Sequence, residues 1–116
     1  MPLDLEKQPA TYEEAVDTII ASIDLDEVAN LKNEGYAPFH FTAGMALRNG
    51  WNLWGAQEDA PKTLFEHMTS RFGKFTCPGD DIGGLIFDGV IAKLKGQSFN
   101  IEEAAQANHD YYKRRV

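Results

Sequence analysis

The segment Ile82-Gly83-Gly84-Leu85-Ile86-Phe87-Asp88-Gly89-Val90-Ile91-Ala92-Lys93-Leu94 is apolar on most sides when it is drawn as a helix. A helix with this character is normally buried by its neighbours all round. Thr76-Cys77-Pro78-Gly79-Asp80-Asp81 precedes the segment, and Gly96 follows it as a helix terminator. We therefore predict that residues 82–94 form the central helix of the fold.

Capping signals on the N-terminal side of this segment predict further helices. Thr11 and Glu14 have the spacing of a capping box, which predicts a helix from about 12 to 22. Asp24 and Glu27 repeat that spacing and predict a second helix, which Gly35 ends. Both predicted helices precede the predicted central helix in the chain.

The remaining helix signals lie on either side of residues 82–94. Residues 39–49 are expected to form a third helix that ends near Gly50, followed by a turn over 51–54. Pro61 is expected in the first turn of a fourth helix, where its missing amide costs nothing. Asn100 is the expected cap of the last helix. The sequence thus predicts an all-α single domain over 1–116, with five to six short helices around residues 82–94 and with residues 1–10 as a flexible N-terminal tail.

The composition narrows the class of protein. A chain of 116 residues that is 43% hydrophobic has enough apolar surface for one core. No run of about 18 apolar residues appears, and the acidic N-terminus does not resemble a signal peptide, so we expect no membrane association. The single cysteine, Cys77, fits a reducing compartment. These features predict a cytoplasmic protein.

The net charge of −7 is distributed unevenly along the chain. Residues 1–40 contain two basic and nine acidic side chains, whereas residues 41–116 contain nine of each. An acidic surface repels phosphate backbones, so direct nucleic-acid binding is not expected. The distribution favours a basic protein partner for the N-terminal third, although acidic surfaces also serve solubility alone.

Two stretches carry a family resemblance: Phe39-His40-Phe41-x-x-Gly44-Met45-x-Leu47-Arg48-Asn49-x-Trp51-x-Leu53-Trp54 and Pro78-x-Asp80-Asp81-Ile82-x-Gly84-Leu85-Ile86. The chain resembles, over about residues 11–115, a family of unknown function found in small bacterial and phage-associated proteins. The pattern of that family reads approximately His-Phe-Gly-x-Gly-Met-Trp-(Ile/Leu)-Arg-Asn-x-Trp-x-Leu-Trp, then His-Pro-Asp-Asp-(Met/Ile)-Ser. The resemblance implies a shared fold and no particular reaction.

This chain departs from the family pattern at several positions. Thr42 stands in place of a glycine, Ala46 in place of a tryptophan and Cys77 in place of a histidine. In the family pattern the two aspartates follow the proline directly, whereas here Gly79 separates Pro78 from Asp80 and Asp81. The loss of one of the two family histidines weakens any function that would use both.

Polar side chains among these aromatic residues are the candidate site residues: His40, Arg48, Asn49, Trp51, Trp54, Asp80 and Asp81. One interpretation is a pocket in which Arg48 and Asn49 bind an anion and His40 titrates near neutrality. The favoured interpretation is structural: Asp80 or Asp81 accepts amide hydrogen bonds where the central helix begins, and one of them pairs with a buried Arg48. At least one tryptophan is expected in the core.

No established catalytic or metal-binding spacing occurs. The histidines and Cys77 show neither CxxC nor HExxH spacing, and there is no phosphate-binding loop, so no metal and no cofactor are predicted. Cys77 has no identified base that would activate it as a nucleophile.

The leading hypothesis is therefore a non-enzymatic interaction module that presents its acidic N-terminal surface, or an aromatic groove near Trp51 and Trp54, to a protein partner. Toxin-immunity proteins and phage inhibitors of host defence are of this kind. A small-ligand binder or hydrolase at His40, Arg48, Asp80 and Asp81 is the alternative. A subunit that oligomerises through Tyr111, Tyr112 and Val116 is the third possibility.

Overall fold

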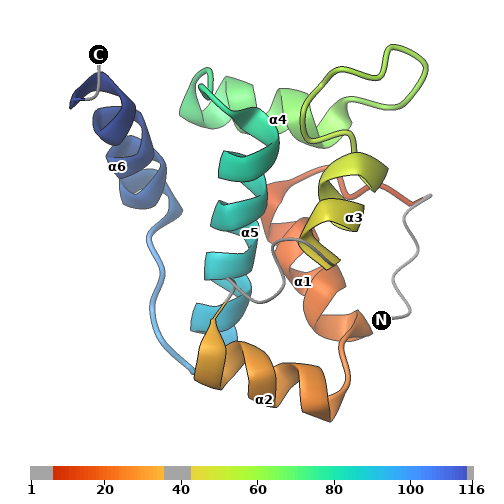
Figure 1. Cartoon of the computed structure of the whole chain (residues 1–116), viewed down its shortest axis with the longest axis vertical. Helices are drawn as coiled ribbons and strands as arrows, with labels where there is room; N and C mark the ends of the chain where they lie inside the picture. Colours follow the sequence, from red (N-terminus) through yellow and green to blue (C-terminus); the bar gives the residue numbers. More distant parts are fainter. Residues whose placement is uncertain (1–6, 36–42, 115–116) are drawn as a thin grey trace.

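The computed structural model of the chain describes residues 7–35 and 43–114. These ranges contain six α-helices and no β-strand, which confirms the predicted all-α fold (Figure 1). The helices are α1 (Tyr12–Ser22), α2 (Leu25–Glu34), α3 (Ala43–Gly50), α4 (Thr63–Phe72), α5 (Pro78–Leu94) and α6 (Ile101–Arg114).

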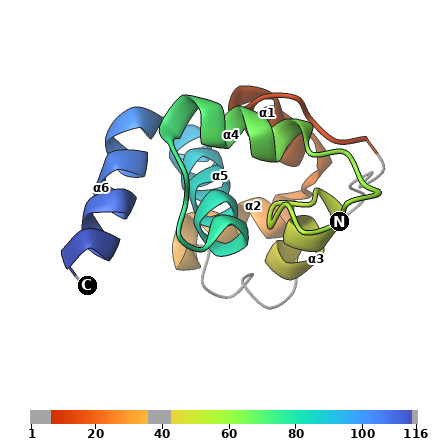
Figure 2. The ribbon, with the colours of Figure 1, turned by 90° about the horizontal axis from the view of Figure 1, so that it is seen from above.

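Helix α5 is the centre of the molecule, as its apolar circumference predicts. It contacts α1, α2, α3 and α6, and Figure 2 shows α6 on one side of it and α3 on the other. Ile82, Ile86 and Val90 of α5 are fully buried. Helix α4 closes one end of the bundle by packing on α1 and α6, and α2 crosses the opposite end (Figure 1).

Helices α1 and α5 approach each other closely at Gly89. The buried Tyr12 hydroxyl donates a hydrogen bond to the carbonyl oxygen of Leu85 at 2.9 Å. A Cβ atom on Gly89 would lie only 2.1 Å from that hydroxyl oxygen, so a larger residue at position 89 would force the two helices apart. Burial, together with the charges of Asp88 and Glu13, raises the pKa of Tyr12 well above its ordinary value.

Three helix starts agree with their predicted caps. The Thr11 hydroxyl accepts a hydrogen bond from the amide of Glu14, and Asp24 and Glu27 form a reciprocal capping box. The Asn100 side chain accepts from the amide of Glu103. Each of these signals is local in sequence, and each predicted its helix start correctly.

The predicted start of the fourth helix is wrong, because its cap comes from a distant part of the chain. Helix α4 begins at Thr63 rather than near Pro61. The side-chain oxygen of Gln8 accepts the amide hydrogen of Leu64 in its first turn, and Nε2 of Gln8 donates to the carbonyl oxygens of Trp51 and Pro61. Gln8 is thus held by three hydrogen bonds.

The same contacts correct the expectation of a flexible tail over residues 1–10. Gln8 is fixed against α4, and the neighbouring Pro9 is buried. The tail interpretation therefore does not hold for these two residues, and residues 1–6 lie outside the described ranges.

The predicted third helix is described from Ala43 onward. It ends at Gly50, as predicted, and the predicted turn follows over residues 51–54. Residues 39–42, including His40, lie outside the described residues. None of the helices in the described ranges combines the length and apolar character that crossing a bilayer requires.

Candidate functional site

The two signature stretches meet in an ion pair between Arg48 and Asp80. Arg48 lies in the last turn of α3 and Asp80 in the first turn of α5, and Nε of Arg48 is 3.5 Å from Oδ1 of Asp80. The arginine side chain is only 6% exposed, whereas the aspartate side chain is 47% exposed. This pair confirms the predicted link between the stretches, and Asp80 supplies it rather than Asp81.

Asp81 faces a different helix. Its Oδ2 accepts the amide hydrogen of Cys77 at 3.1 Å, and its Oδ1 accepts the hydroxyl hydrogen of Tyr112 in α6 at 3.3 Å. The predicted hydrogen bond from an amide at the start of α5 is therefore made by Asp81. Hydrogen bonding to Cys77, with burial and the charge of Asp81, raises the pKa of Tyr112. The two adjacent carboxylates thus tie α5 to α3 and α6 separately, instead of converging on one point.

The two tryptophans have different environments. Trp51 is fully buried in the core, and its Nε1 is a buried donor without a hydrogen-bond partner among the residues that the structure describes. Trp54 is 40% exposed and lies over the first turn of α5. A Cβ atom on Gly79 would be 2.1 Å from the indole of Trp54, so the absence of a side chain at this position makes room for the contact.

Asn52 organises the loop between α3 and α4, although the sequence did not single it out. The residue is buried and has a left-handed backbone with φ of 52°. Its Oδ1 accepts the amide hydrogen of Gln57, and its Nδ2 donates to the carbonyl oxygens of Gln57 and Pro61. The sequence did contain a signal for this turn: asparagine tolerates the left-handed backbone region, and Asn52 stands between the signature residues Trp51 and Leu53.

Of the remaining candidates, the structure describes Asn49 but not His40. Asn49 is exposed, and its backbone carbonyl oxygen accepts a hydrogen bond from Nε2 of Gln57 at 3.2 Å. His40 lies outside the described residues. Within residues 7–35 and 43–114, no three histidine, cysteine, aspartate or glutamate side chains gather into a set that could hold a metal ion.

Ion pairs within the fold neutralise part of the N-terminal acidic charge. Arg71 in α4 contacts both carboxylate oxygens of Glu13 in α1, and it also pairs with Glu102 in α6. Lys93 in α5 pairs with Asp17 in α1 at 2.5 Å. The outer face of α1 is therefore less negative than its sequence indicates.

Helix α2 keeps its acidic face toward solvent. Leu31 is the buried residue of this helix, and Asp24, Asp26 and Glu34 are exposed. Leu25, between two of these acids, is 86% exposed. Among the described residues of the range 1–40, α2 therefore has the surface that best matches the predicted acidic one.

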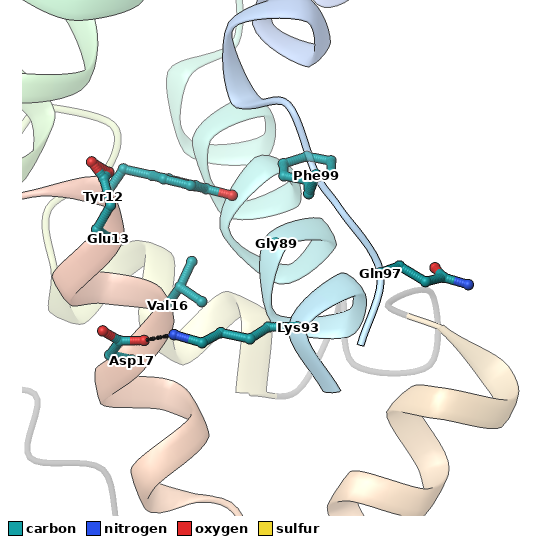
Figure 3. A pocket seen from close by; sticks show the side chains of 8 residues that line it. All are labelled: Tyr12, Glu13, Val16, Asp17, Gly89, Lys93, Gln97 and Phe99. Carbon is teal, nitrogen blue, oxygen red and sulfur yellow. Dashed lines mark hydrogen bonds and ion pairs between the residues drawn. The ribbon is translucent and has the colours of Figure 1, made fainter. Parts of the chain in front are cut away.

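A hollow of about 260 Å³ lies between α1, α5 and the segment that leads into α6 (Figure 3). Tyr12, Val16, Gly89 and Phe99 form its apolar part, and Figure 3 shows the Lys93–Asp17 ion pair along one edge. Glu13 and Gln97 complete the lining. Sequence reasoning did not find this hollow, because its residues come from positions 12 to 99.

Comparison with models of protein families, with curated proteins and with solved structures finds no match for the chain. The family resemblance of the two signature stretches therefore stays a prediction.

Proposed function

We propose that the protein is a non-enzymatic interaction module that binds a basic protein partner through α2, in the manner of toxin-immunity proteins or phage inhibitors of host defence. The observation that carries the proposal is the exposed face of α2, where Leu25 stands 86% exposed between Asp24 and Asp26. An apolar anchor surrounded by like charges suits a partner with an apolar contact inside a basic surface.

The charges within the fold support α2 over α1 as the binding surface. Glu13 and Asp17 of α1 pair with Arg71 and Lys93, so part of their charge is already compensated. Asp26 and Glu34 are exposed on a helix whose only basic residue is Lys32. The strongest attraction for a basic partner is therefore expected at α2, and phosphate backbones should be repelled there.

The arrangement of the signature residues supports a non-enzymatic function over the alternative of a hydrolase. Arg48 is paired with Asp80, and Asp81 accepts hydrogen bonds from Cys77 and Tyr112. General acid–base catalysis needs groups within hydrogen-bond reach of the reacting atoms of one bound substrate. These carboxylates connect three helices instead.

The proposal is tested by capture of partners from a host lysate on the immobilised full chain. The variant Asp26→Lys/Glu34→Lys reverses two exposed charges without removing the Asp24–Glu27 capping box. The variant Leu25→Ser removes the apolar anchor. We expect the wild-type chain to retain a basic protein that salt releases, and we expect both variants to retain much less of it.

The matched control is Glu58→Lys/Asp59→Lys, which makes the same charge change in the exposed loop before α4. This control should retain the partner as the wild-type chain does. Equal retention by the wild-type chain and both α2 variants would contradict the proposal, as would equal loss in the loop control.

A further inference from the structure

We propose that the hollow between α1 and α5 binds a small zwitterion of the α-amino-acid class with an aliphatic side chain. The proposal rests on the size of the hollow, on its apolar walls and on the pair of opposite charges at its edge. It is independent of the protein partner proposed for α2.

The size of the hollow selects small ligands. Its volume of about 260 Å³ is below the range of about 300–1,000 Å³ that is usual for drug-sized ligands. The hollow extends to the backbone of α5 at Gly89, where a Cβ atom would lie 3.2 Å from Cγ2 of Val16. The same Cβ atom would lie 2.1 Å from the Tyr12 hydroxyl oxygen, so Tyr12 and Val16 pack directly on this glycine and form the wall of the hollow there.

The walls of the hollow suit an aliphatic group. Tyr12 and Val16 are buried, and Phe99 is half-buried against the core. The Tyr12 hydroxyl is already used in its hydrogen bond to Leu85, so Tyr12 contributes apolar ring carbons to the wall of the hollow. Figure 3 shows Tyr12, Val16 and Phe99 around the same space, with Gly89 behind it. A small aliphatic side chain would be shielded from water by all three.

The edge of the hollow carries one charge of each sign. Asp17 and Lys93 form an ion pair in which both side chains are more than half exposed, at 62% and 60%. An exposed pair of this kind contributes little to stability, so a ligand can replace it at little cost. The ammonium group of the ligand would take the place of Lys93 at Asp17, and its carboxylate would bind Lys93. Two ion pairs would then replace one.

The remaining polar lining residues are compatible with this charge pattern. Glu13 is engaged by Arg71, and Gln97 is neutral. A ligand with only a carboxylate would leave Asp17 without its lysine, and a ligand with only an ammonium group would leave Lys93 without its aspartate. A zwitterion satisfies both side chains at once.

The test compares three probes that have similar aliphatic groups: L-leucine, 4-methylpentanoate and 3-methylbutylamine. Binding to the full chain is measured by calorimetry and by the NMR signals of the Val16 methyls, the Gly89 amide and the Phe99 ring. We expect L-leucine to shift all three sets of signals and to bind about two- to fivefold more tightly than either singly charged probe.

Variants then assign the two charges. Asp17→Asn and Lys93→Met should each weaken L-leucine binding by about two- to fivefold, because an ion pair at an exposed site contributes modestly. Glu58→Gln and Lys62→Met alter the other exposed lysine–carboxylate pair and should leave binding unchanged. Thermal unfolding of each variant establishes that it is folded under the conditions of the titration.

Three results would overturn the proposal: no signal shifts with millimolar L-leucine, equal binding of a singly charged probe, or unchanged L-leucine affinity in folded Asp17→Asn and Lys93→Met variants.

Discussion

At the scale of single residues, Asn52 shows how one side chain determines the course of a loop. It combines a left-handed backbone with three hydrogen bonds to Gln57 and Pro61, and it is buried between Trp51 and Leu53. These contacts hold the loop that leads from α3 to α4.

Replacing Asn52 with alanine and with glycine separates the contribution of its side-chain hydrogen bonds from that of its left-handed backbone. Asn52→Ala should lower the free energy of unfolding by about 1–3 kcal/mol, because it removes three part-buried hydrogen bonds and strains the backbone. Asn52→Gly should cost about 1 kcal/mol less, since glycine accepts the positive φ. Urea unfolding of both variants provides the measurement. An equal loss in both variants would show that the backbone conformation contributes nothing.

Asp88 gives a prediction on pH at the same scale. Its side chain reaches solvent, but the packed helices around it partly desolvate the carboxyl group and raise its pKa in the folded state. The folded state therefore holds this proton more tightly than the unfolded chain, so ionisation of Asp88 costs stability as pH rises above the unfolded value of about 3.9. Asp88→Asn should accordingly raise the unfolding temperature at pH 7.

The gain from Asp88→Asn should vanish near pH 3, where the carboxyl group is protonated in both states. Thermal unfolding at the two pH values tests this, with Asp59→Asn in the exposed loop as the control. A gain of the same size at pH 3 and pH 7 would contradict the assignment of the effect to ionisation.

At the scale of helices, the origin of each cap explains which boundaries could be predicted. Thr11 and Asp24 cap their helices through residues three positions ahead, so the sequence predicted both starts correctly. The amide of Leu64 is capped by Gln8, which is 56 positions away. No local pattern contains that information, and the start predicted near Pro61 was wrong for this reason.

Gln8 should therefore stabilise a helix to which it does not belong. Gln8→Ala removes one acceptor and two donor contacts and should lower the free energy of unfolding by about 1–2 kcal/mol. In the Gln8→Ala variant, the amide hydrogens in the first turn of α4 should exchange faster than those in the rest of the helix. Hydrogen exchange followed by NMR measures both effects. Unchanged protection of the Leu64 amide would contradict this function of Gln8.

The candidate site was predictable in part for a related reason. Arg48 and Asp80 are polar residues in aromatic and apolar surroundings, and this pattern predicted their pairing. The sequence did not distinguish Trp51 from Trp54, because both are large and apolar. Their positions in the fold distinguish them. Trp51 is buried in the core, whereas Trp54 packs over Gly79 at the start of α5 and stays 40% exposed.

At the scale of the whole molecule, folding redistributes the charge. The sequence places the entire net charge of −7 in residues 1–40. The fold brings Arg71 and Lys93, which are 58 and 76 positions from their partners, onto the acids of α1. These pairings depend on how the helices pack and were not visible in the sequence. They leave α2 as the main acidic surface for the proposed partner.

The same packing joins the two signature stretches through two contacts. One stretch supplies Arg48 and Trp54, and the other supplies Asp80 and Gly79. The ion pair and the contact of the indole with the glycine both join the region of α3 to the first turn of α5. Arg48, Trp54, Gly79 and Asp80 thus connect these two parts of the fold.

The most direct test is a double-mutant cycle on Gly79 and Trp54, measured by urea unfolding. Gly79→Ala alone should lower the free energy of unfolding by about 1–3 kcal/mol, because its Cβ would overlap the indole. In the Trp54→Ala background, the same change should be neutral or stabilising by up to about 1 kcal/mol, since alanine favours a helix over glycine. The same loss in both backgrounds would contradict the claim that these stretches hold each other in place.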